Sequence, residues 1–441
     1  GGTGGGGGGG GSAGGFAIAS LDPTARDIDQ HAVAFDPVKR RVGVVYYNPR
    51  GTQTMTGIDD YDIKYVEWND PDGDGTGTIS PVETIRFVQR KVGLAIAFHP
   101  TTGEPVVSYV GGAPGFIMNQ SIYWFQSDAV INTRNNGTWT ETIVASTGAE
   151  VRCGSTVSDR AAIVVGMWPA LLYDPTGLLY FAYRDGHDGQ FGKQDAEASD
   201  VEVWEGTPPP TTGKCVNYAG DNKQGWGGHI KLVAGAEGRP AMIYDQMLEG
   251  WDDNGSNVWF HERDAQGNWG AAAPVVTISN TQSGASLAYD AMEGYGVAVV
   301  ERATNSLLYV RKVPGATRWN VPDAVYNLGT GGWYPSLAID PVYHEPAIAF
   351  YFCSNRNGIA ESNCLTTEDE LRIRQRIAGT WRETVVDPEG GYLPQLGFFV
   401  QGSGPGAVSK RVLVYRQPSA IDPATSLPVT NQGELKIAVE R

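Results

Sequence analysis

The stretch YPSLAIDPVYHEPAIAFYF, residues Tyr334–Phe352, carries the pattern that decides the fold. Two apolar runs of strand length flank the pair Asp340 and Pro341, which favours a turn. The stretch therefore predicts a hairpin of two buried strands. Close copies are HAVAFDPVKRRVGVVYYN from His31, GLAIAFHPTTGEPVVSYVGG from Gly93 and WPALLYDPTGLLYFAYRDG from Trp168, and weaker copies begin at His229, Gly284 and Tyr392.

A third strand of alternating character follows every copy. The seven segments read DIKYVEW, SIYWFQ, DVEVWEG, NVWFHERD, LLYVRK, ELRIRQR and ELKIAVER. Four of them continue into a G-x-W turn and a fourth strand, as in NNGTWTETIV. The hairpin strands are apolar at almost every position because stacked sheets cover both of their faces, whereas outer strands alternate. Each unit is therefore predicted to be a four-stranded sheet.

The spacing of the copies predicts how they assemble. Their turns, from Asp36 to Val400, have a mean spacing of about 61 residues, which suits propeller blades with long loops. The last copy ends after its third strand, and Phe16–Leu21 can supply the fourth. We therefore predict an all-β fold, a seven-bladed β-propeller of four-stranded blades, closed by N- and C-terminal strands in the last blade. Such closure removes exposed sheet edges.

The chain divides into a linker and one predicted domain. Residues 1–15 form a glycine-rich flexible linker, because glycine offers no side chain to bury, and residues 16–441 form the propeller. The net charge of -16 argues against binding to nucleic acid or anionic lipid, which requires a basic patch. The longest apolar run, residues 161–173, is shorter than the roughly 20 residues of a membrane-spanning helix. No transmembrane segment is therefore predicted.

Four cysteines, Cys153, Cys215, Cys353 and Cys364, allow three pairings. We expect Cys353 to pair with Cys364, and Cys153 with Cys215, if the compartment is oxidising. The alternative is four reduced, buried thiols in a cytosolic protein.

The repeats resemble those of sialidase-like, BNR-type propellers, in which S-L-A-x-D-x-x-G-x-P-x-I-x-Y precedes L-x-Y-A and G-x-W. The resemblance covers about residues 16–441 and implies the architecture. The full Asp-box, S-x-D-x-G-x-x-W, is missing, and the family's arginine cluster, tyrosine nucleophile and acid aspartate cannot be assigned here. The glycine-rich linker resembles that of bacterial surface lipoproteins. It implies an extracellular or outer-surface location, with lipid anchoring through an N-terminal segment that the sequence lacks.

A propeller brings the starts of its first strands and the ends of its second strands to one mouth of the central channel. Flat aromatic rings and charged groups there suit sugars, cations or proteins. The first strands contribute His31, Trp168, His229, Tyr334 and Tyr392, and the second strands contribute Arg184, Asp245, Glu301 and Arg416. The structural alternative is that the aromatic residues plug the channel and that Arg184 and Asp245 form a buried ion pair.

The segment NDPDGDGTGTISPVE, Asn69–Glu83, predicts a calcium-binding loop. Asp70, Asp72 and Asp74 alternate as in the first half of an EF-hand, and Gly75 permits the sharp turn. The second half differs from an EF-hand because Pro81 stands where glutamate is expected, and Glu83 follows two residues later. The alternative is a plain Asp/Gly turn.

Three functional hypotheses follow. The first is a non-enzymatic surface or secreted propeller, stabilised by Ca²⁺, that binds a glycan or a protein at the channel face. The second is a polysaccharide-cleaving hydrolase or lyase with Asp245 and Glu301 as acid and base, and His229 or His31 as proton relay. The third is a structural component of a surface assembly.

Overall fold

The described part of the chain consists mostly of β-strands. The computed structural model describes residues 15–25, 30–37, 39–53, 59–88, 92–112, 115–116, 122–123, 127–146, 164–186, 199–217, 226–246, 254–276, 281–282, 284–301, 304, 306–326, 331–352, 369–418 and 433–441. The rest of the predicted linker, residues 1–14, lies outside the described residues. Cys153, Cys353 and Cys364 lie outside them too.

The first four blades, numbered I to IV, follow one another along the chain. Blade I contains β2 (His31–Asp36), β3 (Arg41–Gln53), β4 (Asp59–Asn69), β5 (Thr78–Ile79) and β6 (Glu83–Val88). Blade II contains β7 (Leu94–Phe98), β8 (Pro105–Gly111), β11 (Asp128–Asn135) and β12 (Thr138–Ser146). Blade III contains β13 (Val164–Tyr173), β14 (Leu179–Gly186), β15 (Ser199–Gly206) and β16 (Thr212–Asn217). Blade IV contains β17 (Gly228–Ala234), β18 (Pro240–Gln246), β19 (Asn254–Glu262) and β20 (Ala273–Val276).

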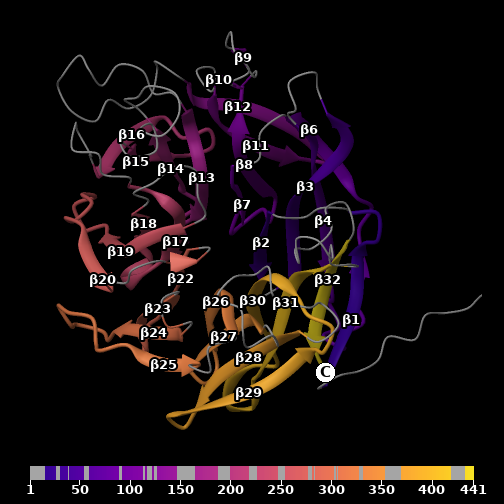
Figure 1. The fold of residues 1–441 in the computed structure, drawn as a ribbon, viewed down its shortest axis with the longest axis vertical. Helices are drawn as coiled ribbons and strands as arrows, with labels where there is room; N and C mark the ends of the chain where they lie inside the picture. Colours follow the sequence, from indigo (N-terminus) through magenta and orange to yellow (C-terminus); the bar gives the residue numbers. More distant parts are fainter. Residues whose placement is uncertain are drawn as a thin grey trace, which may run out of the picture.

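Blades V to VII complete the ring (Figure 1). Blade V contains β22 (Ser286–Asp290), β23 (Gly294–Glu301), β24 (Ser306–Lys312) and β25 (Asp323–Tyr326). Blade VI contains β26 (Gly331–Ile339), β27 (Pro346–Phe352), β28 (Glu370–Ile377) and β29 (Thr380–Asp387). Blade VII contains β30 (Tyr392–Gln401), β31 (Val408–Pro418), β32 (Gly433–Glu440) and β1 (Phe16–Asp22). Short extra elements are β9 (Gly115–Phe116), β10 (Ile122–Tyr123), β21 (Thr281–Gln282) and the 3₁₀ turns Ala236–Gly238 and Gly404–Gly406.

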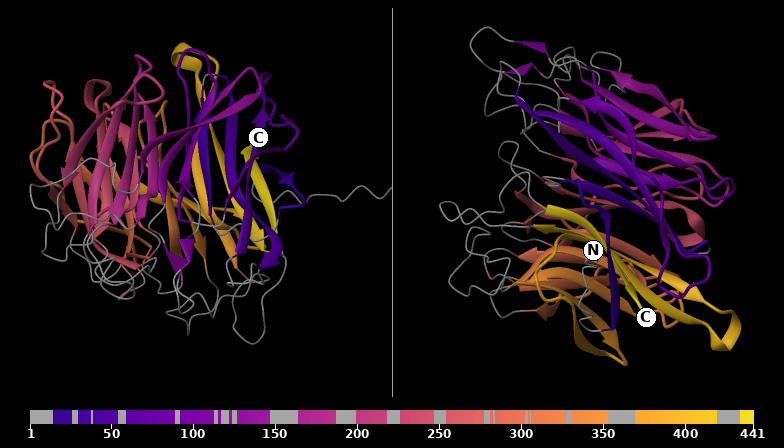
Figure 2. Two further views of the ribbon diagram at one scale, coloured as in Figure 1. Left: turned by 90° about the horizontal axis from the view of Figure 1, so that it is seen from above. Right: turned by 90° about the vertical axis from the view of Figure 1, so that its right-hand side faces the viewer.

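The predicted fold is confirmed: the described strands form seven antiparallel blades in a ring, and the structure is all-β. The ring closes in blade VII, where β1 pairs with β32 from Phe16 opposite Glu440 to Asp22 opposite Leu435. Figure 2 shows the indigo first strand beside the yellow last strands. The Arg441 N–H also donates to the Gly15 carbonyl at 2.9 Å. No helix among the described residues is both long and apolar enough to span a bilayer.

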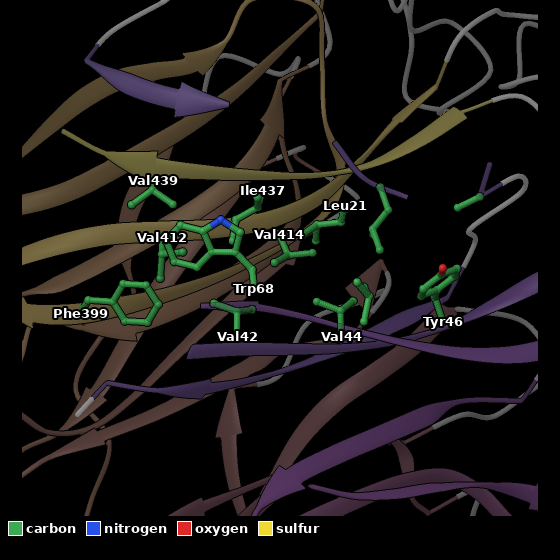
Figure 3. Close-up of a cluster of buried hydrophobic side chains, with 13 residues drawn as sticks. Leu21, Val42, Val44, Tyr46, Trp68, Phe399, Val412, Val414, Ile437 and Val439 are labelled. Carbon is green, nitrogen blue, oxygen red and sulfur yellow. The ribbon is translucent and has the colours of Figure 1, made fainter. Parts of the chain in front are cut away.

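The core lies between the blades, where neighbouring sheets face each other. Every residue of β14 and β18 is buried, as the apolar hairpin strands predict. Between blades VII and I, Trp68 stacks on Phe399 with ring centroids 5.9 Å apart and planes 1° apart (Figure 3). Ring stacking of this kind contributes about 0.5–1.5 kcal/mol beyond the burial of apolar area.

The hairpin turns of the repeats share one hydrogen-bonding role. The Asp340 carboxylate accepts from the N–H groups of Val342 and Tyr343 at 2.9 and 3.1 Å. In blade II, His99 replaces the turn aspartate, and its Nδ1 accepts from the N–H groups of Thr101 and Thr102 at 3.2 Å. An imidazole nitrogen can therefore cap the turn as a carboxylate does.

Candidate functional site

Four first strands begin with the same bulge, which places one residue in the left-handed region. These residues are Trp168, His229, Tyr334 and Leu393, with φ between 44° and 54°. In each strand the backbone register shifts across the bulge before regular pairing resumes. A repeated bulge at the inner end of a blade re-aims side chains toward the mouth of the channel.

The bulge corrects one sequence alignment. Tyr392 pairs with Arg416, just as Met167 pairs with Arg184, so Leu393 and not Tyr392 occupies the position of Trp168. The sequence interpretation used the first aromatic residue of each copy as its marker. Because the bulge has the same length in each strand, Tyr392 corresponds to Met167 and Trp333, one residue before the bulge position.

The predicted mouth residues of neighbouring blades lie close together around the ring. The rings of Trp168 and His229 are 5.7 Å apart, and those of Tyr334 and Tyr392 are 5.8 Å apart. A Cβ added at Gly93 would come within 2.8 Å of the Trp168 Cα, and one at Gly284 within 2.5 Å of the His229 Cβ. Blades II and V thus require glycine where their neighbours carry large residues.

The centre of the candidate site is a histidine–carboxylate pair in blade IV. His229 Nδ1 lies 3.3 Å from Asp245 Oδ2, and Asp245 is 0% exposed. Trp168 is 8% exposed, because the Arg184 guanidinium lies 5.2 Å above its ring and His229 covers another side. The Trp168 indole therefore supports the site, and the expected open stacking face is not present.

Lys231 is the polar residue of this site that sequence reasoning missed. It is the first paired residue after the bulge in β17, where the other bulged strands carry Ala170, Ser336 and Gln395. Solvent reaches its side chain, yet burial lowers the pKa of its amine, and the charge of Asp245 opposes that shift. Both observations fit a narrow channel that admits water. A lysine inside the apolar segment HIKLVA was the available signal.

Arg184 is held in place by hydrogen bonds. It is 1% exposed, and its Nε donates to Ser199 Oγ at 2.8 Å. Ser199 in turn donates to the Trp226 carbonyl at 2.8 Å. Burial lowers the pKa of the Arg184 guanidinium to about 9. Neither Ser199 nor Trp226 was predicted, because neither belongs to the apolar repeat pattern from which the mouth residues were chosen.

Glu301 is not at the position assigned to it by alignment. Val297 and Val299 pack toward blade IV, as Phe181 and Tyr183 pack toward blade II, so Val300 occupies the position of Arg184. Side chains alternate between the two faces of a strand, and a shift by one residue therefore changes the face. Glu301 Oε2 instead accepts from Thr304 Oγ1 at 2.8 Å.

His31 and Arg416 approach each other where blade VII meets blade I. Burial, and next the charge of Arg416, lower the pKa of His31 to about 4. The charge of Lys231 acts in the same direction from blade IV. His31 is therefore neutral at pH 7.

We expect His31 to make the fold sensitive to acid. Below pH 6.5 the unfolded chain binds a proton at His31, whereas the native chain does so only near pH 4, so stability falls across that interval. The loss reaches about 3 kcal/mol at the acid end. Urea unfolding near pH 7 and near pH 4 should show this loss of stability in the wild type. His31→Phe should lack the part of the loss that His31 causes. Asp22 and Glu440, whose pKa values are lowered, affect both proteins equally. Equal acid losses in the two proteins would contradict the assignment.

The four predicted calcium ligands lie in different surroundings, and three of them accept hydrogen bonds from other groups of the protein. The Asp70 carboxylate is buried and accepts from the N–H groups of Gly73 and Gly75 at 3.0 Å. Asp74 accepts from Thr76, and Asp72 is exposed. Glu83 is bound by Arg134 at 2.6 Å and by the Trp139 indole N–H at 2.7 Å.

Glu83 therefore belongs to the interface of blades I and II. Within the described ranges, no three His, Cys, Asp or Glu side chains are grouped to hold a metal. Calcium binding stays a prediction.

Of the four cysteines, Cys215 is the one that lies among the described residues. Cys215, in β16, is disulfide-bonded. Its partner is not among the described residues, so the pairing of the four cysteines stays a prediction.

No family model and no curated protein matches the chain. Similar solved structures include a protein of unknown function from Dyadobacter fermentans, 12% identical with a TM-score of 0.47, over 96% of this chain and 97% of that one. The NanB sialidase from Streptococcus pneumoniae is 8% identical with a TM-score of 0.47, over 95% of this chain and 69% of the sialidase. An α-L-arabinanase from Penicillium chrysogenum, complexed with arabinobiose, is 12% identical with a TM-score of 0.43, over 79% and 93% of the two chains. These similarities concern the propeller fold alone.

Proposed function

We propose that this chain binds a glycan, without cleaving it, at the axial mouth formed by the bulged first strands. The observation that carries the proposal is Lys231, a water-accessible amine in the channel beside the buried pair of His229 and Asp245. An amine, an imidazole and a carboxylate together donate to and accept from sugar hydroxyl groups. Tyr334, which is partly exposed, offers an aromatic surface at the start of the first strand of blade VI.

The proposed setting is extracellular or on the cell surface. The disulfide bond of Cys215 supports an oxidising compartment, because such bonds rarely persist in the cytosol. Bound Ca²⁺ would join Asp70 and Asp74 and stiffen the loop after β4. This role is independent of the glycan site.

One observation favours a second candidate, a polysaccharide-cleaving enzyme. A carboxylate that accepts from one imidazole nitrogen orients the other nitrogen, as in a general base. The contact between His229 and Asp245 has this form. The base in that case would be His229. Glu301 would not serve as its partner, since it faces Thr304.

The test is incubation of the purified protein with neutral and uronate-containing polysaccharides, with and without EDTA. Size-exclusion chromatography would follow both co-elution and chain length. We expect co-elution of at least one polysaccharide with unchanged length. Weaker co-elution with EDTA would support the calcium role, and unchanged co-elution would contradict it. Shortened chains would contradict the non-enzymatic proposal and establish the enzyme. The absence of both effects would contradict glycan binding and indicate a protein partner or a structural role.

A further inference from the structure

The G-x-W tryptophans contact the preceding blade in a repeated arrangement. In blade II, Trp139 meets Tyr65 of blade I edge-on at 5.2 Å, and the Arg134 guanidinium lies 5.9 Å from the same tyrosine. In blade VI, Trp381 meets Tyr309 of blade V edge-on at 5.6 Å, and the Arg376 guanidinium lies 5.7 Å from it. The two junctions therefore share one framework of tyrosine, arginine and tryptophan.

Register identifies the acidic residue of each framework. Arg134 pairs with Trp139 and Arg376 pairs with Trp381 across the outer strands. Tyr65 pairs with Glu83, and Tyr309 pairs with Asp323. Asp323 is thus the counterpart of Glu83 at the second junction.

At the first junction the acidic residue closes the framework. Glu83 accepts from Arg134 at 2.6 and 3.2 Å and from the Trp139 indole N–H at 2.7 Å. The three polar groups satisfy one another. This junction is a structural contact between blades.

At the second junction the arginine turns to another partner. Glu293, which is 6% exposed, accepts from Arg376 at 2.6 Å, from Arg311 at 3.0 Å and from the Tyr309 hydroxyl at 2.9 Å. Among the described residues, Asp323 is exposed and makes no hydrogen bond, and the Trp381 indole N–H has no acceptor. The second junction has every residue of the framework, but the Asp323 carboxylate and the Trp381 indole N–H are unpaired within the described part of the chain.

A hollow of about 520 Å³ lies at this junction, and its lining includes Arg311, Asp323, Glu345, Arg376 and Trp381. Its size falls in the range of small-molecule sites, about 300–1,000 Å³. Glu345 and the turn at Gly379 belong to the hairpin ends of blade VI, which lie opposite the first-strand starts. The hollow therefore lies between blades V and VI, which are neighbours in Figure 1, and its lining places it on the face opposite the axial mouth.

The charges at the hollow disfavour an anionic ligand. Arg311 and Arg376 are offset by Glu293, Asp323 and Glu345, so no excess positive charge is present to attract an anion. Asp323 offers acceptors, Arg376 and the indole N–H offer donors, and the partly exposed Trp381 ring offers an apolar surface. Sugar hydroxyl groups donate and accept at once, and the C–H face of a sugar ring packs on an aromatic ring.

We propose that the hollow between blades V and VI binds a neutral sugar residue. One hydroxyl donates to the Asp323 carboxylate, another accepts from the Trp381 indole N–H, and Glu293 holds the arginines in place. This site adds to the proposed axial site and does not depend on it. In the framework of blades I and II, the Trp139 indole N–H already donates to Glu83.

The experiment is ¹⁹F NMR of the full chain labelled with 5-fluorotryptophan, titrated with methyl glycosides of neutral hexoses and pentoses, and separately with inorganic phosphate. The Trp381 and Trp139 resonances are assigned with Trp381→Phe and Trp139→Phe. We expect at least one neutral glycoside to shift the Trp381 resonance and to leave that of Trp139 in place. Asp323→Ala should weaken this binding about tenfold or more, because a hydrogen bond to a charged acceptor is lost.

Glu237→Ala, an exposed carboxylate in the hairpin of blade IV, is the matched control and should bind as the wild type does. Equal melting temperatures of both variants would show that folding is intact. No glycoside response at Trp381, a response to phosphate alone, or unchanged binding in Asp323→Ala would each overturn the proposal. Asp245→Asn separates the two sites. This variant should no longer co-elute with the polysaccharide, but the Trp381 resonance should still respond to the glycoside. Such a result would concern the axial site only.

Discussion

Deletion of residues 1–22 is expected to destroy the native fold or to leave a protein that aggregates. These residues include β1, the outer strand of blade VII, which pairs with β32 along its length. Phe16 and Leu21 are 1% and 2% exposed. Their burial contributes about 3–6 kcal/mol, a large fraction of the roughly 5–15 kcal/mol that stabilises a folded domain.

The deletion has a second consequence, because it uncovers the edge of β32. An uncovered edge presents unpaired N–H and C=O groups that can pair with another chain. Size-exclusion chromatography should therefore detect aggregates, and thermal unfolding should show a strongly lowered or absent transition. The matched control is deletion of residues 1–14 alone, which contain almost no side chain to bury and should leave the melting temperature unchanged. Equal melting temperatures for the two deletions would contradict closure of the ring by β1.

Asp245→Ala is expected to destabilise the protein by about 1–3 kcal/mol, because the His229 imidazole loses a hydrogen-bonding partner at a largely buried position. The Asp245 carboxylate is fully buried, and its charge opposes the lowering of the Lys231 pKa. It also contacts His229 at 3.3 Å. Urea unfolding would measure the loss of stability. The variant should also no longer co-elute with a polysaccharide that the wild type binds.

The double variant Asp245→Ala/Lys231→Met separates stability from binding. Removal of the amine removes the uncompensated charge, so the double variant should be more stable than Asp245→Ala. It should still fail to bind the polysaccharide, because both hydrogen-bonding groups are absent. Additive stability losses of the two substitutions would contradict the coupling of the two charges. Polysaccharide co-elution at wild-type strength in the double variant would remove both residues from the site.

The repeat pattern was sufficient to predict the seven blades and their closure, but one strand was misplaced: the third strand of blade II is β11, Asp128–Asn135, and not the segment SIYWFQ before it. Each hairpin strand is apolar on both faces because it lies between two sheets, and that pattern is local in the sequence. The exchange of aspartate for His99 in a turn was also predictable, because the turn residues occupy fixed positions in the repeat.

The details of the mouth were harder to predict, for a physical reason. Tyr392 was matched to Tyr334, but the register shows that it corresponds to Trp333, so Leu393 was overlooked at the bulge position. The same one-residue ambiguity placed Glu301 where Val300 lies. Trp168 was expected to be open, but Arg184 and His229 cover it.

Contacts between blades are not encoded in any one repeat. Glu83 was assigned to a calcium loop, yet it binds Arg134 of the next blade. The hollow beside Trp381 depends on Glu293, which lies in the hairpin of the neighbouring blade and draws Arg376 away. Such exchanges of partner become visible only when the blades are assembled.

The most direct test of the axial site is a crystal structure of the protein soaked with an oligosaccharide fragment of the co-eluting polysaccharide. The proposal predicts an intact sugar at the axial mouth, with hydroxyl groups within hydrogen-bonding distance of Lys231 and His229. A sugar bound only elsewhere on the protein, with the axial mouth free of it, would contradict the central claim.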